Sequence, residues 1–265
     1  MKIKFRLALS LGALVSLTAA AQDVTLTRLD CGTGSNDPRR FSDTFAYTET
    51  TKPFTFSCYV VRHGADVMVW DTGYLPGSVP SATNKPLVDL LKQINVNSDD
   101  VKYVGISHFH ADHTGQLGSL KNATLLIGKG DWDGITANPP MGGANVKGFE
   151  AWVAEKRKVE PQSADKDVFG DGTVLMLRAP GHTPGHSILL VRLKDMGPVI
   201  LSGDAVHFRE NLEIEGVPVF NHDRAQTLAS IQRIKQIQKN LKATLIIQHD
   251  PRDIDKLPAF PNAAK

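Results

Sequence analysis

The residues best suited to chemistry lie within six positions of one short segment. His108, His110, Asp112 and His113 fall in the run SHFHADHTGQ, residues 107–116. Imidazole nitrogens and carboxylate oxygens are common ligands of transition-metal ions, and so dense a group in a soluble protein indicates a bound cation. At strand-like spacing the first two histidines point the same way, and a turn redirects the next two groups. The segment therefore predicts a metal site, with an exposed polar loop as the alternative.

A strand must lead into this segment, because its first residues continue a β-rich run. VKYVGIS (101–107) is rich in β-forming residues, while TGQLGSL (114–120) after the last histidine could start a helix. The ligand candidates are thus expected on a loop between a strand and a helix. Loops carried by rigid elements are where catalytic groups concentrate.

Three later segments extend the pattern. They are GHTPGH (181–186), LSGD (201–204) and IQHD (247–250). Together with the first segment, and in this order, they resemble the motifs of the metallo-β-lactamase superfamily from about Thr55 to the C-terminus. The resemblance implies an α/β fold, an αββα sandwich with all metal ligands on loops at one edge of two facing sheets.

The resemblance also implies the ligands of two divalent ions, with zinc as the expected metal. One ion would be held by His108, His110 and His186, the second by Asp112, His113 and His249, and Asp204 would bridge both. Metal binding lowers the pKa of water from about 15.7 towards 7, so a hydroxide shared by the ions would be the nucleophile. Asp112 could also carry a proton to the leaving oxygen. A structural zinc site is closed by four ligands, whereas this larger set leaves open positions, which favours an enzyme over a zinc-binding or sensing protein.

Three further residues are expected beside the ligands. Asp71, in WDTG (70–73), resembles an aspartate that the superfamily places near the metals, where a ligating imidazole donates its second N–H; a turn aspartate capping its own backbone is the alternative. By the same resemblance His182 is the histidine that braces its loop without binding metal. His207 stands three residues after Asp204, where many acyl-homoserine lactonases carry a tyrosine. It is therefore predicted to face the site and to contact the substrate carbonyl.

The residues after Asp204 indicate which branch of the superfamily the chain resembles. DAVHFRENL (204–212) and DRAQTLASI (223–231) resemble the N-acyl-homoserine lactonase branch, as does TFSCYVV (55–61). The resemblance implies an enzyme that opens the lactone ring of N-acyl-homoserine lactones. A metallo-β-lactamase acting on β-lactam antibiotics is one alternative, but that group lacks the bridging aspartate. A glyoxalase II-like thioesterase keeps it, but holds glutathione with basic residues that we do not identify in this chain.

Large apolar residues in irregular segments near the motifs are candidates for the wall of a substrate cleft. They are Tyr74, Leu75, Met141, Phe149 and Trp152. Small-molecule sites are lined mainly by apolar and aromatic side chains, so we expect the acyl chain to lie against these residues. Ordinary core packing is the alternative for each, since large apolar residues are usually buried.

The N-terminus has the pattern of a secretory signal peptide. Lys2, Lys4 and Arg6 precede the apolar run 7–20, which ends in the small-residue cleavage pattern AAA. An uncleaved membrane anchor is the alternative, although the run is too short to span a bilayer comfortably. We therefore expect residues 1–21 to be removed and the protein to be exported, to the periplasm or the medium.

Residues 22–265 then suit one α/β domain without nucleic-acid or stable membrane partners. The chain has 30 basic and 28 acidic residues, so the loss of three basic residues changes the net charge from +2 to −1 (27 − 28). No basic run remains to suggest nucleic-acid binding. Cys31 and Cys58 could form a disulfide, which export would permit, or remain two buried thiols.

The rest of the chain alternates strands and helices. Apolar periodicity and turn residues predict strands over 24–29, 54–62, 66–70, 123–127, 173–178, 187–193, 198–202 and 243–247. Helices are predicted over 86–94, weakly over 149–156, and after an N-cap at Asp223. Residues 32–53 are expected to form a long surface loop, and 130–144 an irregular segment broken by glycine and proline.

Overall fold

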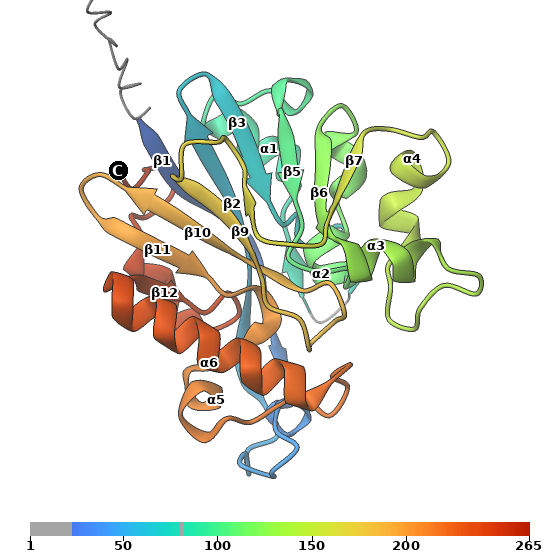
Figure 1. The fold of residues 1–265 in the computed structure, drawn as a ribbon, viewed down its shortest axis with the longest axis vertical. Coiled ribbons are helices and arrows are strands. Elements are labelled where there is room, and N and C mark those ends of the chain that lie inside the picture. Colours follow the sequence, from blue (N-terminus) through green and yellow to red (C-terminus); the bar gives the residue numbers. More distant parts are fainter. Residues whose placement is uncertain (1–22, 80–81) are drawn as a thin grey trace, which may run out of the picture.

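Two β-sheets face each other in the computed structural model, which describes residues 23–79 and 82–265 (Figure 1). The predicted leader, 1–21, lies outside the described residues. The first sheet has the strand order β4-β1-β2-β3-β5-β6-β7 and the second the order β12-β11-β10-β9-β8. In the part of the chain so described, no helix combines the length and apolar character needed to cross a membrane.

The strands and helices have the following bounds. The first sheet contains β1 (Val24–Asn36), β2 (Lys52–His63), β3 (Asp66–Trp70), β4 (Thr83–Asn84), β5 (Tyr103–Gly105), β6 (Thr124–Gly128) and β7 (Val159–Gln162). The second contains β8 (Lys166–Asp167), β9 (Val174–Arg178), β10 (Ser187–Leu193), β11 (Gly197–Leu201) and β12 (Thr244–Ile246). The helices are α1 (Leu87–Gln93), α2 (Ala111–Thr114), α3 (Lys129–Thr136), α4 (Glu150–Val153), α5 (Arg209–Ile214) and α6 (Arg224–Leu241).

Both faces of the first sheet are buried. Along β2, Tyr59 and Val61 pack between the two sheets, whereas Val60 packs on the other face, with Leu87 and Leu91 of α1. Successive side chains of a strand point to opposite faces, so a strand of continuous apolar residues serves two cores at once.

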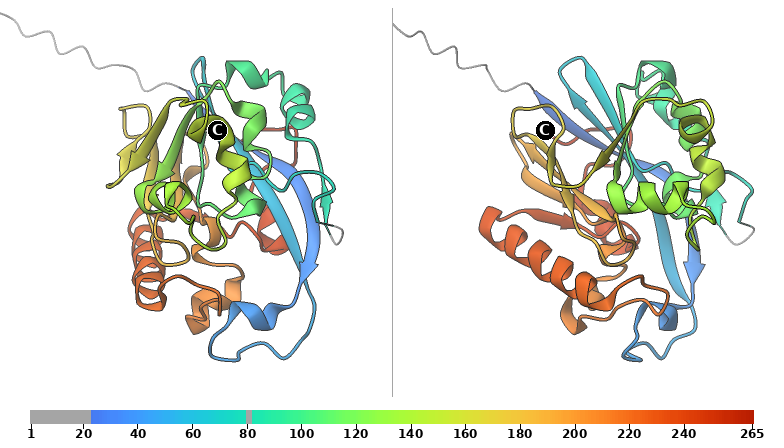
Figure 2. Two further views of the ribbon diagram at one scale, coloured as in Figure 1. Left: turned by 90° about the vertical axis from the view of Figure 1, so that its right-hand side faces the viewer. Right: turned by 45° about the vertical axis from the view of Figure 1, so that its right-hand side comes forward.

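The second sheet is covered in the same way by α6. In β10, Leu189 packs between the sheets, and Leu190 packs on the outer face with Ile231 and Ile234 of the helix. Figure 2 shows α6 along the outside of the second sheet and helices α1, α3 and α4 on the side of the first. The layers are therefore helix, sheet, sheet and helix, and the predicted αββα sandwich is confirmed.

Most predicted elements are present, and two differences have physical reasons. β1 continues through the first residues of the predicted loop to Asn36, because residues 32–36 pair with 52–56 of β2 after an irregularity between Asp30 and Gly32. Tertiary pairing here overrides a glycine-rich local sequence. The predicted irregular segment 130–144 begins instead within α3, whose packing against the site is described below.

Cys31 and Cys58 form a disulfide that joins β1 to β2, with their Cα atoms 5.9 Å apart. Both residues are fully buried in the core on the helix side of the first sheet. A Cβ on Gly73 would lie only 2.9 Å from the Cβ of Cys31. The disulfide is thus packed directly beneath the WDTG segment.

Candidate metal centre

Four segments at the ends of strands carry the candidate ligands. His108, His110, Asp112 and His113 follow β5; His182 follows β9, Asp204 follows β11 and His249 follows β12. The loop before Asp204 depends on Gly203, whose φ is 49° and whose missing Cβ would lie 2.8 Å from Nε2 of His186. Only glycine adopts this conformation at so close an approach without strain.

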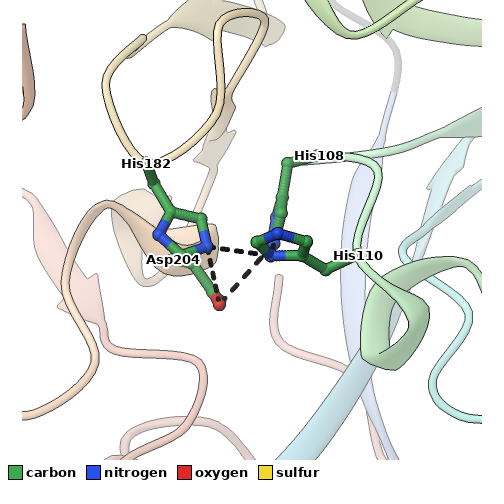
Figure 3. Close-up of side chains that lie close together, drawn as sticks. All are labelled: His108, His110, His182 and Asp204. Carbon is green, nitrogen blue, oxygen red and sulfur yellow. Dashed lines mark hydrogen bonds and ion pairs between the residues drawn. The ribbon is translucent and has the colours of Figure 1, made fainter. Parts of the chain in front are cut away.

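The first group consists of His108, His110, His182 and Asp204. Figure 3 shows the two histidines of one loop approaching His182 and Asp204 from the opposite side. Nδ1 of His110 lies 2.9 Å from Nε2 of His108 and 3.0 Å from Nε2 of His182. Oδ2 of Asp204 lies 3.6 Å and 3.5 Å from the same two Nε2 atoms.

The second group consists of Asp112, His113, Asp204 and His249. Nε2 of His113 and Nε2 of His249 are 3.2 Å apart, and each lies 3.6 Å from Oδ2 of Asp112. Oδ1 of Asp204 lies 3.0 Å from the first nitrogen and 2.8 Å from the second. Asp204 therefore directs one oxygen to each group.

These separations suit a divalent metal ion in each group. Tetrahedral donors about 2.0–2.1 Å from one ion lie about 3.3 Å from one another, and the observed distances fall on both sides of that value. Oδ1 of Asp204 is buried without a hydrogen-bond donor. A buried carboxylate oxygen needs a positive partner, so a cation is the expected one.

The second ring nitrogens of the histidines are held by protein groups. Nδ1 of His113 lies 2.9 Å from the Asp71 carboxylate, Nδ1 of His249 lies 2.7 Å from the Thr55 carbonyl, and Nδ1 of His182 lies 3.1 Å from Oδ1 of Asn221. Each acceptor fixes the proton on Nδ1 and leaves the lone pair of Nε2 directed into its group.

Asp71 lies against His113 and accepts hydrogen bonds from two of the ligand loops. Its Oδ1 accepts from the backbone N–H of Ser107, and its Oδ2 accepts from Ser107 Oγ, His113 Nδ1 and Gln248 Nε2. Its φ of 57° lies in the left-handed region that aspartate tolerates better than most residues. The carboxylate therefore links the loop that begins at Ser107 to the loop that carries Gln248 and His249.

Burial and neighbouring charges shift the pKa values of the site groups in different directions. Burial acts to lower the pKa of His113, but the carboxylates of Asp204, Asp112 and Asp71 outweigh it and raise this pKa well above its usual value. Burial lowers the pKa of His108 and of His182, which keeps both imidazoles neutral. Burial also acts to raise the pKa of Asp204, but the surrounding imidazoles, His249 first, outweigh it and hold this pKa well below the usual value. Neutral imidazole and ionised carboxylate are the forms that coordinate a divalent ion.

His186, which the motif comparison assigned to the first ion, does not join the group, and His182 takes its place. Both ring nitrogens of His186 are already used: Nδ1 lies 3.1 Å from the Ala179 carbonyl, and Nε2 accepts the backbone N–H of Asp204 at 2.8 Å. His186 therefore positions the bridging aspartate through its backbone. The two histidines of GHTPGH thus have the opposite roles to those expected: His182 lies in the metal group, and His186 braces the loop.

His207 lies at the cavity beside the two groups, as predicted. Its Nε2 is 3.1 Å from Oδ2 of Asp204, and its ring packs 4.5 Å from that of Phe41. The cavity has a volume of about 270 Å³. It is lined by Asn36, Arg40, Phe41, Phe54, Tyr74, His110, Ala111, Asp112, Asp204, His207 and Phe220.

The expected substrate-contacting residues divide into two sets. Tyr74 lines the metal cavity, and both Tyr74 and Leu75 line a neighbouring cavity. Phe149 and Trp152 are core residues, 0% and 2% exposed, so the prediction that they contact substrate is wrong. Met141 packs against the same core. For these last three residues the alternative of ordinary core packing holds.

Sequence reasoning missed the aromatic wall of the metal cavity. Phe41 and Phe54 stack at 5.7 Å, and the guanidinium of Arg40 lies 5.3 Å above the ring of Phe220. Phe41 and Arg40 belong to the predicted long loop 32–53. Its length was the one available signal, since long loops in compact domains are often functional.

Asp131 of α3 was also missed, although it joins two ligand loops. Its Oδ2 accepts from the backbone N–H of Phe109 and the hydroxyl of Thr183, and its Oδ1 accepts from the backbone N–H of Gly185. Burial raises the pKa of this carboxyl to about 7. A single aspartate in a helix gives no sequence signal of such a role.

Comparison with known proteins agrees with this geometry. The model of the metallo-beta-lactamase superfamily matches residues 52–249. The N-acyl homoserine lactonase AttM of Rhizobium radiobacter is 34% identical over 179 residues, which are 65% of this chain and 68% of that protein.

Solved structures share the fold. The crystal structure of a quorum-quenching N-acyl homoserine lactone lactonase has a TM-score of 0.78 at 24% identity and covers 92% of this chain and 99% of its own. An N-acyl homoserine lactone hydrolase, solved with N-hexanoyl-L-homoserine at its catalytic metal centre, has a TM-score of 0.77 at 22% identity, covering 92% and 100%. The chain belongs to the metallo-beta-lactamase superfamily, as its ordered motifs and its αββα sandwich both indicate.

Proposed function

We propose that the chain is an exported, dinuclear metal-dependent hydrolase that opens the lactone ring of N-acyl-homoserine lactones. The observation that carries the proposal is the position of Asp204, whose two oxygens face two separate donor groups at the floor of an aromatic cavity. The similarity to curated lactonases supports the choice of substrate.

The residues present fit two ions, with zinc as the expected metal. His108, His110 and His182 would hold one, Asp112, His113 and His249 the other, and Asp204 both. Nitrogen and carboxylate oxygen donors suit zinc. When bound, the ions would lower the pKa of water between them and so supply the hydroxide that attacks the lactone carbonyl.

His207 and Asp112 would act on the two oxygens of the ester group. His207 lies at the cavity wall with Nε2 3.1 Å from Oδ2 of Asp204, and we assign to this N–H a second hydrogen bond, to the carbonyl oxygen as negative charge develops there. Attack at the carbonyl carbon breaks its bond to the ring oxygen, which leaves as a hydroxyl and needs one proton. Asp112, whose side chain is 15% exposed at the same cavity, is assigned to accept the proton that the attacking hydroxide loses as the product carboxylate forms and to pass it to this oxygen.

A β-lactam-hydrolysing enzyme is the alternative from the same superfamily. The bridging carboxylate of Asp204 disfavours it, since that group lacks such a residue. The cavity wall of Phe41, Phe54 and Phe220 suits an amphiphilic acyl lactone with little charge.

Export is supported by the signal-peptide pattern of residues 1–21 and by the disulfide between Cys31 and Cys58. Disulfides persist in oxidising compartments and are rare in the cytosol. The location is tested by finding the mature protein in periplasmic or culture-medium fractions with its new N-terminus near Gln22.

One experiment tests the activity. The purified mature protein is analysed for metal content, and its turnover is measured on N-hexanoyl-homoserine lactone, a β-lactam and S-lactoylglutathione. We expect about two metals per chain and turnover of the lactone far above that of the other two. Full lactone turnover after complete metal removal, or preferential turnover of either alternative substrate, would overturn the proposal.

A further inference from the structure

Tyr74 stands at the wall of the metal cavity without an assigned part in the reaction. It follows WDTG (70–73) in the loop after β3, and it lines the cavity together with Asp112, Asp204 and His207. Besides its ring, a phenol carries an O–H group that can donate a hydrogen bond. The surroundings of this hydroxyl decide whether Tyr74 is only a part of the wall or takes part in the chemistry.

The backbone on both sides of Tyr74 is fixed against the first ligand loop. The N–H and the hydroxyl of Thr72 both donate to the carbonyl of His113, at 2.7 and 3.0 Å. A Cβ on Gly115 would lie 2.3 Å from the backbone nitrogen of Leu75 and 2.7 Å from the carbonyl carbon of Tyr74. The side chain of Tyr74 therefore starts from a fixed point beside α2.

The ring of Tyr74 is held on the side of the second metal group. It packs edge-to-face on Phe56, with ring centroids 4.9 Å apart, and Phe56 packs in the same manner 5.8 Å from the ring of His249. Edge-to-face contacts are a favoured arrangement of aromatic rings. One aromatic side chain thus orients the phenol relative to a histidine of the metal centre.

The charged groups of the cavity act on the hydroxyl of Tyr74. Asp112 raises the pKa of this phenol most, burial and then Asp204 raise it further, and Arg40 acts in the opposite direction. No hydrogen bond to another residue of 23–79 or 82–265 contributes to this shift. A phenol keeps its proton at neutral pH, since its usual pKa is about 10. The hydroxyl therefore remains a donor that can serve a substrate atom beside Asp112.

The two donors of the cavity lie on different sides of the metal centre. His207 lies 3.1 Å from Oδ2 of Asp204, the oxygen that faces the first metal group. Asp112 and His249 belong to the second group, and Tyr74 lies on their side. A lactone whose carbonyl oxygen lies at His207 would therefore direct its ring oxygen towards Asp112 and Tyr74.

We propose that the hydroxyl of Tyr74 donates a hydrogen bond to the ring oxygen of the lactone as that oxygen leaves. This inference rests on the proposed function and adds a catalytic residue to it. When the bond between the carbonyl carbon and the ring oxygen breaks, the electron pair stays on the oxygen. Tyr74 stabilises this charge and keeps its own proton, while Asp112 passes on the proton that completes the new hydroxyl.

Tyr74→Phe tests this role, because it removes the hydroxyl and keeps the ring. Tyr74 is only partly buried, so the change leaves the core intact. Tyr103→Phe is the matched control, since Tyr103 begins β5 and lines neither this cavity nor its neighbour. The parameters kcat and KM are measured on N-hexanoyl-homoserine lactone and on the corresponding thiolactone, in which sulfur replaces the ring oxygen. Metal content and Tm are recorded for each variant.

We expect Tyr74→Phe to lower kcat on the lactone about tenfold and to change KM less than about twofold, because the donor acts on charge that develops in the transition state. The loss on the thiolactone should be less than about threefold, since a thiol has a pKa of only about 8.5 and its sulfur leaves with less help from a donor. The control should leave kcat unchanged on both substrates.

The outcomes separate this inference from the proposed function. If the wild-type protein opens the lactone and Tyr74→Phe has the same kcat, the residue is only a part of the wall and this inference alone fails. Equal losses on the lactone and the thiolactone would also overturn it, because the hydroxyl would then act away from the leaving atom. The kcat on the lactone decides alone if the wild type does not open the thiolactone. If the wild type does not open the lactone, the proposed function is wrong, and this inference with it.

Discussion

The carboxylate of Asp71 lies 2.9 Å from the imidazole of His113, measured from Oδ2 to Nδ1, and both side chains are fully buried. The same carboxylate accepts from Ser107 just before the first ligand, and from Gln248 just before the last. One residue outside the two metal groups therefore orients ligands that lie far apart in the sequence.

Asp71→Asn should weaken metal binding while preserving the fold. Asparagine is isosteric and tolerates the positive φ at this position. It lacks the charge that fixes the proton on Nδ1 of His113, and loss of such a partner typically costs about 10–100-fold in metal affinity. Competition with a chromophoric chelator measures this. An affinity equal to that of the wild type would show that Asp71 serves only the backbone turn.

His207→Ala should retain both metals and lose about tenfold or more in kcat, because a donor aimed at developing charge stabilises the transition state more than bound substrate. His207→Tyr should restore part of the loss, since a phenol also donates a hydrogen bond. The readouts are kcat, metal content and Tm.

The contact between His207 and Asp204 gives the competing expectation. If His207 serves only to hold this carboxylate, the alanine variant will show a lower Tm with near-normal kcat in its folded fraction. A well-folded alanine variant with wild-type kcat and full metal content excludes the role of His207 in transition-state stabilisation.

His182→Ala and His186→Ala should separate a ligand from a residue that positions one. The first removes a donor from a metal group, so it should lower the metal content by about one ion per chain. The second removes the acceptor of the Asp204 backbone N–H and should lower stability by about 1–3 kcal/mol, while both ions remain bound at saturating metal. Elemental analysis and denaturant unfolding measure the two effects. The reverse pattern would restore the assignment of His186 as the ligand.

Glu210 gives a prediction about acid stability. Arg252 makes two hydrogen bonds of 2.8 Å to its carboxylate and lowers the pKa of Glu210 to about 2. Because the folded-state pKa is depressed, this pair stabilises the protein above about pH 4.5, and the contribution is lost as the pH falls through about 2. The side chain is 35% exposed, so solvent screening limits the effect to about 1 kcal/mol at pH 7.

Glu210→Gln should therefore be less stable than the wild type at pH 7 and converge with it at low pH. Urea unfolding of both proteins in metal-free form, at pH values from 7 to 2, measures the difference. A difference that does not change with pH would show that the carboxylate charge contributes nothing.

The sequence predicts which strands position the site better than it predicts which of two nearby histidines belongs to the metal group. Asp112, His113, Asp204 and His249 each follow a predicted strand, so their convergence at one edge follows from the layer order. GHTPGH places His182 and His186 at the two ends of one turn, and spacing does not reveal which imidazole is used internally. The answer depends on the Ala179 carbonyl and the Asp204 backbone N–H, which lie close to His186 only in the folded chain.

The cavity wall was less predictable, because its members come from distant parts of the chain. Phe41 and Phe220 are within 5.7 Å of each other although they are far apart in sequence. Large apolar residues such as Trp152 have the same local pattern whether they line a cleft or fill a core. Only the packing of whole elements decides between these outcomes.

The disulfide between Cys31 and Cys58 has a consequence for the unfolded chain. It ties two positions 27 residues apart, and closing a loop of this size removes conformational entropy equivalent to roughly 3–4 kcal/mol from the unfolded ensemble. The segment so enclosed contains Arg40 and Phe41 of the cavity wall. The covalent link thus offsets part of the entropy lost when this connection between β1 and β2 becomes ordered, and so helps to hold the cavity wall in place.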